Sequence, residues 1–114
     1  MTVPSLQLKR RFVESVRTGL KTKTLRARLG GGFEPGARLT LLNGYRTDSV
    51  IGHAVIVSVD RVRVVDLTAA DAVADGFADE LELRAELHRT YPLVDELWRV
   101  TWRDFQPRAM SRLA

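Results

Sequence analysis

A run rich in valine and isoleucine over residues 51–66 is the feature that most restricts how this chain can fold. Branched side chains at this density favour extended backbone, and the run is longer than an ordinary strand. It therefore predicts two strands, with a break at Asp60 and Arg61. So much β structure in the middle of the chain means that the core is built around a sheet.

The remaining pattern surrounds this run with short elements. Further strands are predicted over residues 5–8, 24–28, 38–42 and 97–105, and helices over 12–20, 69–75 and 79–89. This order lacks the regular alternation of a doubly wound sheet. It predicts an α+β fold, a small mixed β-barrel of five to six strands that the last strand closes, with two to three flanking helices. Residues 1–105 are expected to form one domain and 106–114 a basic tail.

The charge is unevenly spread along the chain. Residues 1–28 contain eight lysines and arginines against one acid, whereas most acids lie in residues 60–96. A basic N-terminal third suggests a partner that carries phosphate. A solvated surface balanced by the acidic segment explains the same numbers equally well.

Composition excludes several kinds of chemistry and location. The chain has no cysteine, which excludes disulfides, thiolate zinc sites and cysteine nucleophiles. Its two histidines, His53 and His88, are far apart in sequence, so neither a metal site nor a cofactor is expected. The longest apolar run, at residues 54–59, is too short to span a bilayer, and no signal peptide is evident. The expected protein is a cytoplasmic monomer.

The stretch over residues 19–28 concentrates four cations and two threonines directly after the first predicted helix. Gly19 ends that helix, and Leu25 and Ala27 then alternate with polar residues as in a half-buried strand. In a regular strand Lys21 and Thr24 would point to opposite faces. Their convergence on one site therefore requires a turn between them, which the glycine makes plausible.

This stretch belongs to a larger pattern. In order, the chain contains Phe12-Val13, G-x-K-T-x-T-x-R over residues 19–26, Pro35-Gly36, Asp75-Gly76-Phe77, Tyr91-Pro92 and Trp98-Arg99-Val100. It resembles, from about residue 6 to residue 105, the ASCH-domain family of PUA-like β-barrels. The resemblance implies a cleft lined by the motif and a role in RNA binding or RNA metabolism. One small bacterial branch of that family hydrolyses N(4)-acetylcytidine as an amidohydrolase.

The catalytic lysine, threonine and glutamate of that branch fall on Lys21, Thr24 and Asp75. Aspartate in place of glutamate shortens the reach by about 1.5 Å, one carbon–carbon bond. A misplacement of this size lowers a rate by about a hundredfold. Glu80 is a nearby alternative carboxylate, although the spacing favours Asp75.

The chemistry places defined demands on these residues. The Thr24 hydroxyl needs a base, and Lys21 serves only when neutral, a state that burial and the neighbouring cations Lys23, Arg26 and Arg28 favour by lowering its pKa. Arg26 is suited to stabilise the developing oxyanion. The same cations, including Lys23 and Arg28, alternatively bind RNA phosphates in a non-catalytic module. A third hypothesis, RNA cleavage, lacks an identifiable base.

Other candidate residues follow from their positions. Tyr45 and Arg46 follow a predicted turn at residues 43–44 and are candidates for base stacking and phosphate contact. Trp98 and Trp102 share a face of the last strand, which indicates core packing instead. His53, at the start of a valine-rich strand, is interpreted as structural.

Overall fold

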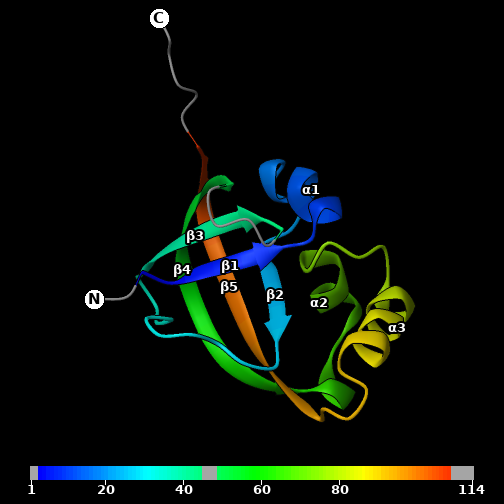
Figure 1. Cartoon of the computed structure of the whole chain (residues 1–114). Coiled ribbons are helices and arrows are strands. Elements are labelled where there is room, and N and C mark those ends of the chain that lie inside the picture. Colours follow the sequence, from blue (N-terminus) through cyan, green and yellow to red (C-terminus); the bar gives the residue numbers. More distant parts are fainter. Residues whose placement is uncertain (1–2, 45–48, 109–114) are drawn as a thin grey trace, which may run out of the picture.

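The computed structural model describes residues 3–44 and 49–108, and its centre is one five-stranded mixed sheet in the order β1-β3-β4-β5-β2 (Figure 1). The strands are β1 (Ser5–Leu8), β2 (Lys23–Arg26), β3 (Arg38–Asn43), β4 (Val50–Arg63) and β5 (Glu96–Pro107). β1 runs parallel to β3, and the other neighbours are antiparallel. The predicted α+β architecture with a small mixed sheet is confirmed.

The sheet curls into a half-barrel whose two edge strands, β1 and β2, approach each other. Arg26 Nη2 on β2 donates a hydrogen bond of 2.7 Å to the backbone carbonyl of Gln7 on β1. The prediction that the last strand closes the barrel is wrong, because β5 lies inside the sheet between β4 and β2. The opening therefore lies between β1 and β2.

The predicted break at Asp60 and Arg61 is also wrong, because β4 continues through both residues. Arg99 on β5 forms an ion pair of 2.6 Å with Asp60, and Arg61 stacks on the ring of Trp98 at 4.8 Å. These cross-strand contacts satisfy charges that would otherwise favour a turn. A pattern along one strand does not contain this information, because the partners come from β5.

The helices are shorter than the sequence pattern predicts at the N-terminal end. The predicted helix over 12–20 is a 3₁₀ turn, η1 (Arg10–Phe12), followed by α1 (Val13–Arg17). A second 3₁₀ turn is η2 (Val64–Asp66), followed by α2 (Ala69–Ala74) and α3 (Glu80–Thr90). Thr68 and Asp71 have the sequence spacing of a capping box, with Asp in place of the usual Glu or Gln, and the structure forms this capping box at the start of α2. No helix in the described part of the chain is long and apolar enough to cross a membrane.

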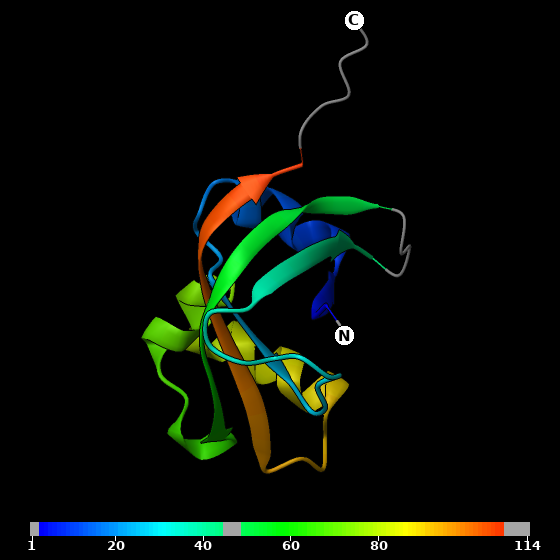
Figure 2. The same cartoon turned by 90° about the vertical axis from the view of Figure 1, so that its left-hand side faces the viewer.

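Two hydrophobic clusters share the long strands β4 and β5, whose curvature is visible in Figure 2. One cluster joins residues of β1, β3 and α1 to those of β4 and β5, and it contains Leu39, Leu41 and Ile56. The other lies under α2 and α3 and contains Leu83 and Leu97. Trp102 is buried in the first cluster, as expected, whereas Trp98 is half-buried. The opening between β1 and β2 thus lies beside both clusters.

Candidate functional site

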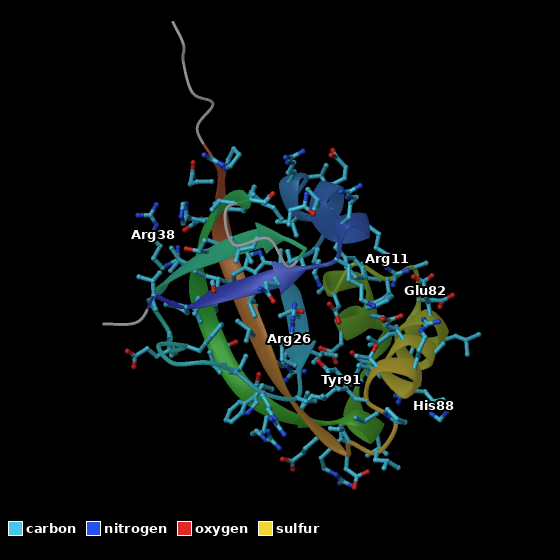
Figure 3. All side chains as sticks on the ribbon, viewed as in Figure 1. Arg11, Arg26, Arg38, Glu82, His88 and Tyr91 are labelled. Carbon is cyan, nitrogen blue, oxygen red and sulfur yellow. The ribbon has the colours of Figure 1, made fainter. Side chains whose placement is uncertain are left out.

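A pocket of about 140 Å³ lies at the opening between β1 and β2, where α3 and the end of α2 also meet. It is small by the standard of ligand pockets, and its size suits part of a ligand such as a single ring. Arg26 from β2 and Tyr91 after α3 both line the pocket, and Figure 3 shows them near each other in this view. The lining residues are Gln7, Leu8, Lys9, Phe12, Lys21, Thr24, Leu25, Arg26, Gly44, Asp75, Phe77, Glu86, Leu87, Thr90 and Tyr91.

Lys21 enters this pocket because the chain turns before β2 begins. Gly19 has φ +82°, a left-handed conformation that ends α1 and that glycine adopts readily. The Lys21 backbone N–H then donates to the Ser15 carbonyl at 2.9 Å, and the Thr22 N–H donates to the Ala74 carbonyl at 2.8 Å. The segment is therefore fixed to both α1 and α2. Lys21 and Thr24 line the same pocket, as the turn after Gly19 was expected to allow.

The Lys21 ammonium is fully enclosed, with 1% of the residue exposed. Nζ donates hydrogen bonds to the backbone carbonyls of Lys23 and Asp75, each at 2.7 Å, and to the Asp75 carboxylate. The ring of Phe12 lies 4.8 Å from the same nitrogen. These three oxygens use all three N–H groups of an ammonium.

Burial moves this pair toward its neutral form. Desolvation lowers the pKa of Lys21 below its usual value, against the opposing charge of Asp75. Desolvation likewise raises the pKa of Asp75, against the opposing charge of Lys21. Arg26 and Arg11 add like-charge repulsion that lowers the pKa of Lys21 further. A lysine and an aspartate whose pKa values move toward each other are suited to exchange a proton.

Asp75 owes its position to the end of α2. It is the C-terminal cap residue of α2, and its N–H donates to the Asp71 carbonyl at 3.0 Å. Gly76 follows with φ +92°, and a Cβ there would lie 2.9 Å from a ring carbon of Phe12. Only glycine therefore lets the chain reverse while Phe12 packs over this turn. The result is a carboxylate that points at Lys21.

Thr24 and Arg26 project from β2 into the same pocket. Thr24 is paired with Val100 of β5 and is 4% exposed. Its Oγ1 lies 3.4 Å from Arg26 Nε, a long hydrogen bond. Within the described residues, Lys21 makes its side-chain hydrogen bonds to Lys23 and Asp75 and none to Thr24. The hydroxyl thus faces the pocket next to a guanidinium.

Aromatic rings form the apolar part of the wall. Phe12 and Phe77 meet edge to face with ring centres 5.3 Å apart. The Arg11 guanidinium lies over both rings, at 4.6 and 5.3 Å. Tyr91, the residue that caps the C-terminal end of α3, also lines the pocket. A planar heterocycle finds flat apolar contacts here beside a few polar groups.

Glu86 is a pocket residue that the sequence reasoning missed. It accepts hydrogen bonds from Lys9 Nζ at 2.6 Å, from Thr90 at 3.1 Å and from Arg89. The hydrogen bond from Lys9 contributes most to lowering its pKa to about 2. Its place next to the buried Leu87 on α3 was the available signal, since that position borders the inward face of the helix.

The other predicted residues lie outside the pocket lining. Lys23 Nζ forms an ion pair with Asp71 Oδ1 at 3.4 Å, and Arg99 Nη1 pairs with the same oxygen at 3.0 Å. Arg28 is exposed beyond the end of β2, and Glu80 pairs with Arg84 at 3.0 Å. Tyr45 and Arg46 lie outside the described residues. His53 belongs to β4, the central strand of the sheet, which β5 separates from β2. The described residues contain no group of three metal-binding side chains.

Comparison with solved structures gives the fold a name. No family model matches the sequence, and no curated protein matches it. The ASCH protein of Zymomonas mobilis superposes with a TM-score of 0.71 and 21% identity, over 91% of this chain and 68% of that one. A protein of Enterococcus faecalis V583 gives 0.65 and 16%, over 98% and 88%. The half-barrel with its pocket therefore has the fold of the ASCH structures.

Proposed function

We propose that the pocket binds a nucleoside with an acylated exocyclic amine, of which N(4)-acetylcytidine is the model compound, and hydrolyses its amide bond. The observation that carries this proposal is the enclosed pair of Lys21 and Asp75 beside the Thr24 hydroxyl. A nucleophile, a base and an acid are the three groups that amide hydrolysis requires. The aromatic wall of the pocket suits a single flat base.

The Lys21–Asp75 pair supports proton transfer because two protonation states use the same contacts. An ammonium donates to three oxygens: two carbonyls and the carboxylate. A neutral amine donates to the two carbonyls and accepts from a protonated Asp75. One proton moves between the two side chains and no hydrogen bond is lost. Burial lowers the pKa of Lys21 and raises that of Asp75, which makes the neutral form, with Lys21 as a base and Asp75 as an acid, accessible from the ion pair.

In the acylation step, protonated Asp75 turns its proton toward the leaving amine and releases the lone pair of Lys21 Nζ. Thr24 Oγ1 then bonds to the acyl carbon and its proton passes to Lys21 Nζ. The carbonyl electron pair moves to the acyl oxygen, where Arg26 stabilises the charge. The carbon–nitrogen bond then breaks, and the leaving amine takes the proton of Asp75. The products are the free nucleoside and an acyl-threonine ester, with the lysine–aspartate pair now ionised.

In the deacylation step, a water molecule attacks the ester and gives its proton to the Asp75 carboxylate. The Thr24 oxygen leaves and takes a proton from the Lys21 ammonium. The carboxylic acid departs, and the pair returns to its neutral state. Each cycle consumes one water molecule.

A non-catalytic RNA-binding module is the second candidate function. Arg26 in the pocket and the exposed Arg28 beyond β2 are cations suited to phosphate, whereas Lys23 is held by Asp71. Salt separates the two functions, since binding through several phosphates weakens steeply with added salt. Recognition of an uncharged nucleoside barely responds to salt.

The experiment incubates the protein with N(4)-acetylcytidine and follows cytidine by chromatography. We expect turnover by the parent protein and by Lys23→Ala, whose side chain does not line the pocket. Lys21→Ala and Thr24→Ala are expected to lose at least a hundredfold in kcat/KM. The absence of product from the parent protein overturns the hydrolase, and full activity in both pocket variants overturns the roles assigned here.

A further inference from the structure

A second, open groove of about 550 Å³ lies at the start of β3, away from the pocket. Its lining includes Arg38, His53, Asp104, Gln106 and Arg108. Gly44, just after the other end of β3, lines the pocket. The six residues of β3 separate the two sites by roughly 20 Å, at about 3.3 Å per residue. Figure 3 shows Arg38 on the opposite side of the molecule from Tyr91.

The register of the sheet gathers the polar side chains on one face. Arg38 on β3 is opposite Val55 on β4, and Thr40 is opposite His53. Arg38 and His53 are therefore diagonal neighbours on the same face of an antiparallel pair. On the other side of β4, His53 is opposite Gln106 of β5. Arg108 follows the end of that strand, and its backbone N–H donates to the Ile51 carbonyl at 2.9 Å.

A bulge in β5 shapes the groove. Asp104 has φ +56°, the one left-handed residue other than glycine among those described. Arg103 is opposite Val55 and Gln106 is opposite His53, so β5 has one residue more than β4 over this stretch. Such bulges re-aim the side chains on either side of them. Here Phe105 packs on the core while Gln106 lines the groove.

The groove carries uncompensated positive charge. Neither Arg38 nor Arg108 forms an ion pair within residues 3–44 and 49–108, and the one acid of the groove, Asp104, is paired with Arg103. Burial, and then the charge of Arg38, lowers the pKa of His53 below its usual value. Guanidinium groups on a shared open face match the oxygens of phosphate.

We propose that this groove is a second binding site, which holds the phosphate backbone of a single-stranded RNA whose target nucleoside occupies the pocket. The choice of RNA as the carrier of the phosphates rests on the proposed function, whereas the anion site rests on the groove alone. At roughly 3.4 Å per nucleotide, the spacing along one strand of a stacked double helix, the separation corresponds to about six nucleotides, and an extended single strand covers it with fewer. A short RNA reaches the pocket only, and a longer one reaches both sites.

The test compares two variant pairs and two RNA lengths. Arg38→Ala/Arg108→Ala removes the groove cations, and Arg17→Ala/Arg63→Ala removes two exposed arginines that line neither site. Binding of a fifteen-nucleotide and a three-nucleotide RNA, each with a central N(4)-acetylcytidine, is measured from 50 to 200 mM salt. We expect the groove pair to weaken binding of the longer RNA about tenfold and to lower the salt slope by about 1.4, at ~0.7 per phosphate.

The trinucleotide and the control pair are expected to show no such change. Equal weakening by both pairs, or equal weakening for both lengths, overturns the proposal. If the parent protein does not hydrolyse the nucleoside, but the groove pair still weakens binding of the longer RNA alone, the proposed hydrolase is overturned and the groove remains supported as a binding site.

His53 provides a direct readout of the groove by NMR, and His88, exposed on α3, is the internal control. We expect the longer RNA to shift the His53 resonances and raise its pKa, and to leave His88 unchanged. A His53 shift of the same size with inorganic phosphate at equal phosphate concentration shows a simple anion site and overturns the RNA assignment. The absence of any shift of the His53 resonances overturns the proposal that the groove is a binding site.

Discussion

Lys21 contacts Asp75 twice, through the backbone carbonyl at 2.7 Å and through the carboxylate. The backbone contact survives any substitution at residue 75, whereas the carboxylate contact does not. The backbone contact thus holds the Lys21 side chain in place, whereas the carboxylate contact balances its charge. Substitutions at residue 75 therefore change mainly the charge balance of Lys21.

Asp75→Asn leaves a buried lysine without its counter-charge. Breaking a buried pair in this way lowers the free energy of unfolding by about 3–5 kcal/mol. Urea unfolding at pH 7 measures the change, and Asp66→Asn, exposed on η2, is the control with an expected effect within about 0.5 kcal/mol. Equal stability of the two variants would show that Lys21 is not charged in the folded protein.

Lys21→Met combined with Asp75→Asn removes both charges. Replacement of a whole buried pair is far less destabilising than removal of one partner. We expect the double variant to be more stable than Asp75→Asn alone, with a coupling free energy of about 1–3 kcal/mol. Additive effects in the double-mutant cycle would contradict a direct interaction. Activity on N(4)-acetylcytidine should not return with the stability.

Gly76→Ala tests the turn that aims Asp75. The substitution introduces a side chain at φ +92° and places its Cβ 2.9 Å from Phe12. We expect a loss of more than about 1 kcal/mol, or about 4–8 °C in Tm for each kcal/mol. Gly30→Ala, where nothing lies within 4 Å of the new Cβ, is the control. Equal melting temperatures of the two variants would contradict this geometry.

The lowered pKa of Glu86 predicts that the protein loses stability in acid. Its pKa falls from 4.5 to about 2 on folding, chiefly because Lys9 donates to it. A lowered pKa contributes stability that is present above pH 4.5 and is lost as the pH falls toward 2. Glu86→Gln should lower the free energy of unfolding at pH 7 by about 1 kcal/mol, the upper range for a partly exposed pair. Near pH 2 the variant and the parent should converge, and a constant difference across the range would contradict the assignment.

The sequence predicts best what is local. The capping box of Thr68 and Asp71 lies within four residues, and the turn at Gly19 places Lys21 through its own backbone. The continuity of β4 depended on Arg99, which pairs with Asp60 from 39 residues away. Glu86 lines the pocket and accepts a hydrogen bond from Lys9, the residue after β1, a contact that the pattern of its own helix does not specify. The features that the sequence predicted wrongly or missed thus depend on contacts with residues far away in the chain.

The gap between β1 and β2 has a consequence for self-association. A half-barrel has two strand edges with unpaired backbone groups, and such edges are sites at which copies of a chain aggregate. Here those edges lie against the same pocket, and the Arg26 side chain already occupies the Gln7 carbonyl. An approaching strand of another molecule finds side chains in its way. The opening that admits a ligand therefore also protects the sheet from growing by another strand.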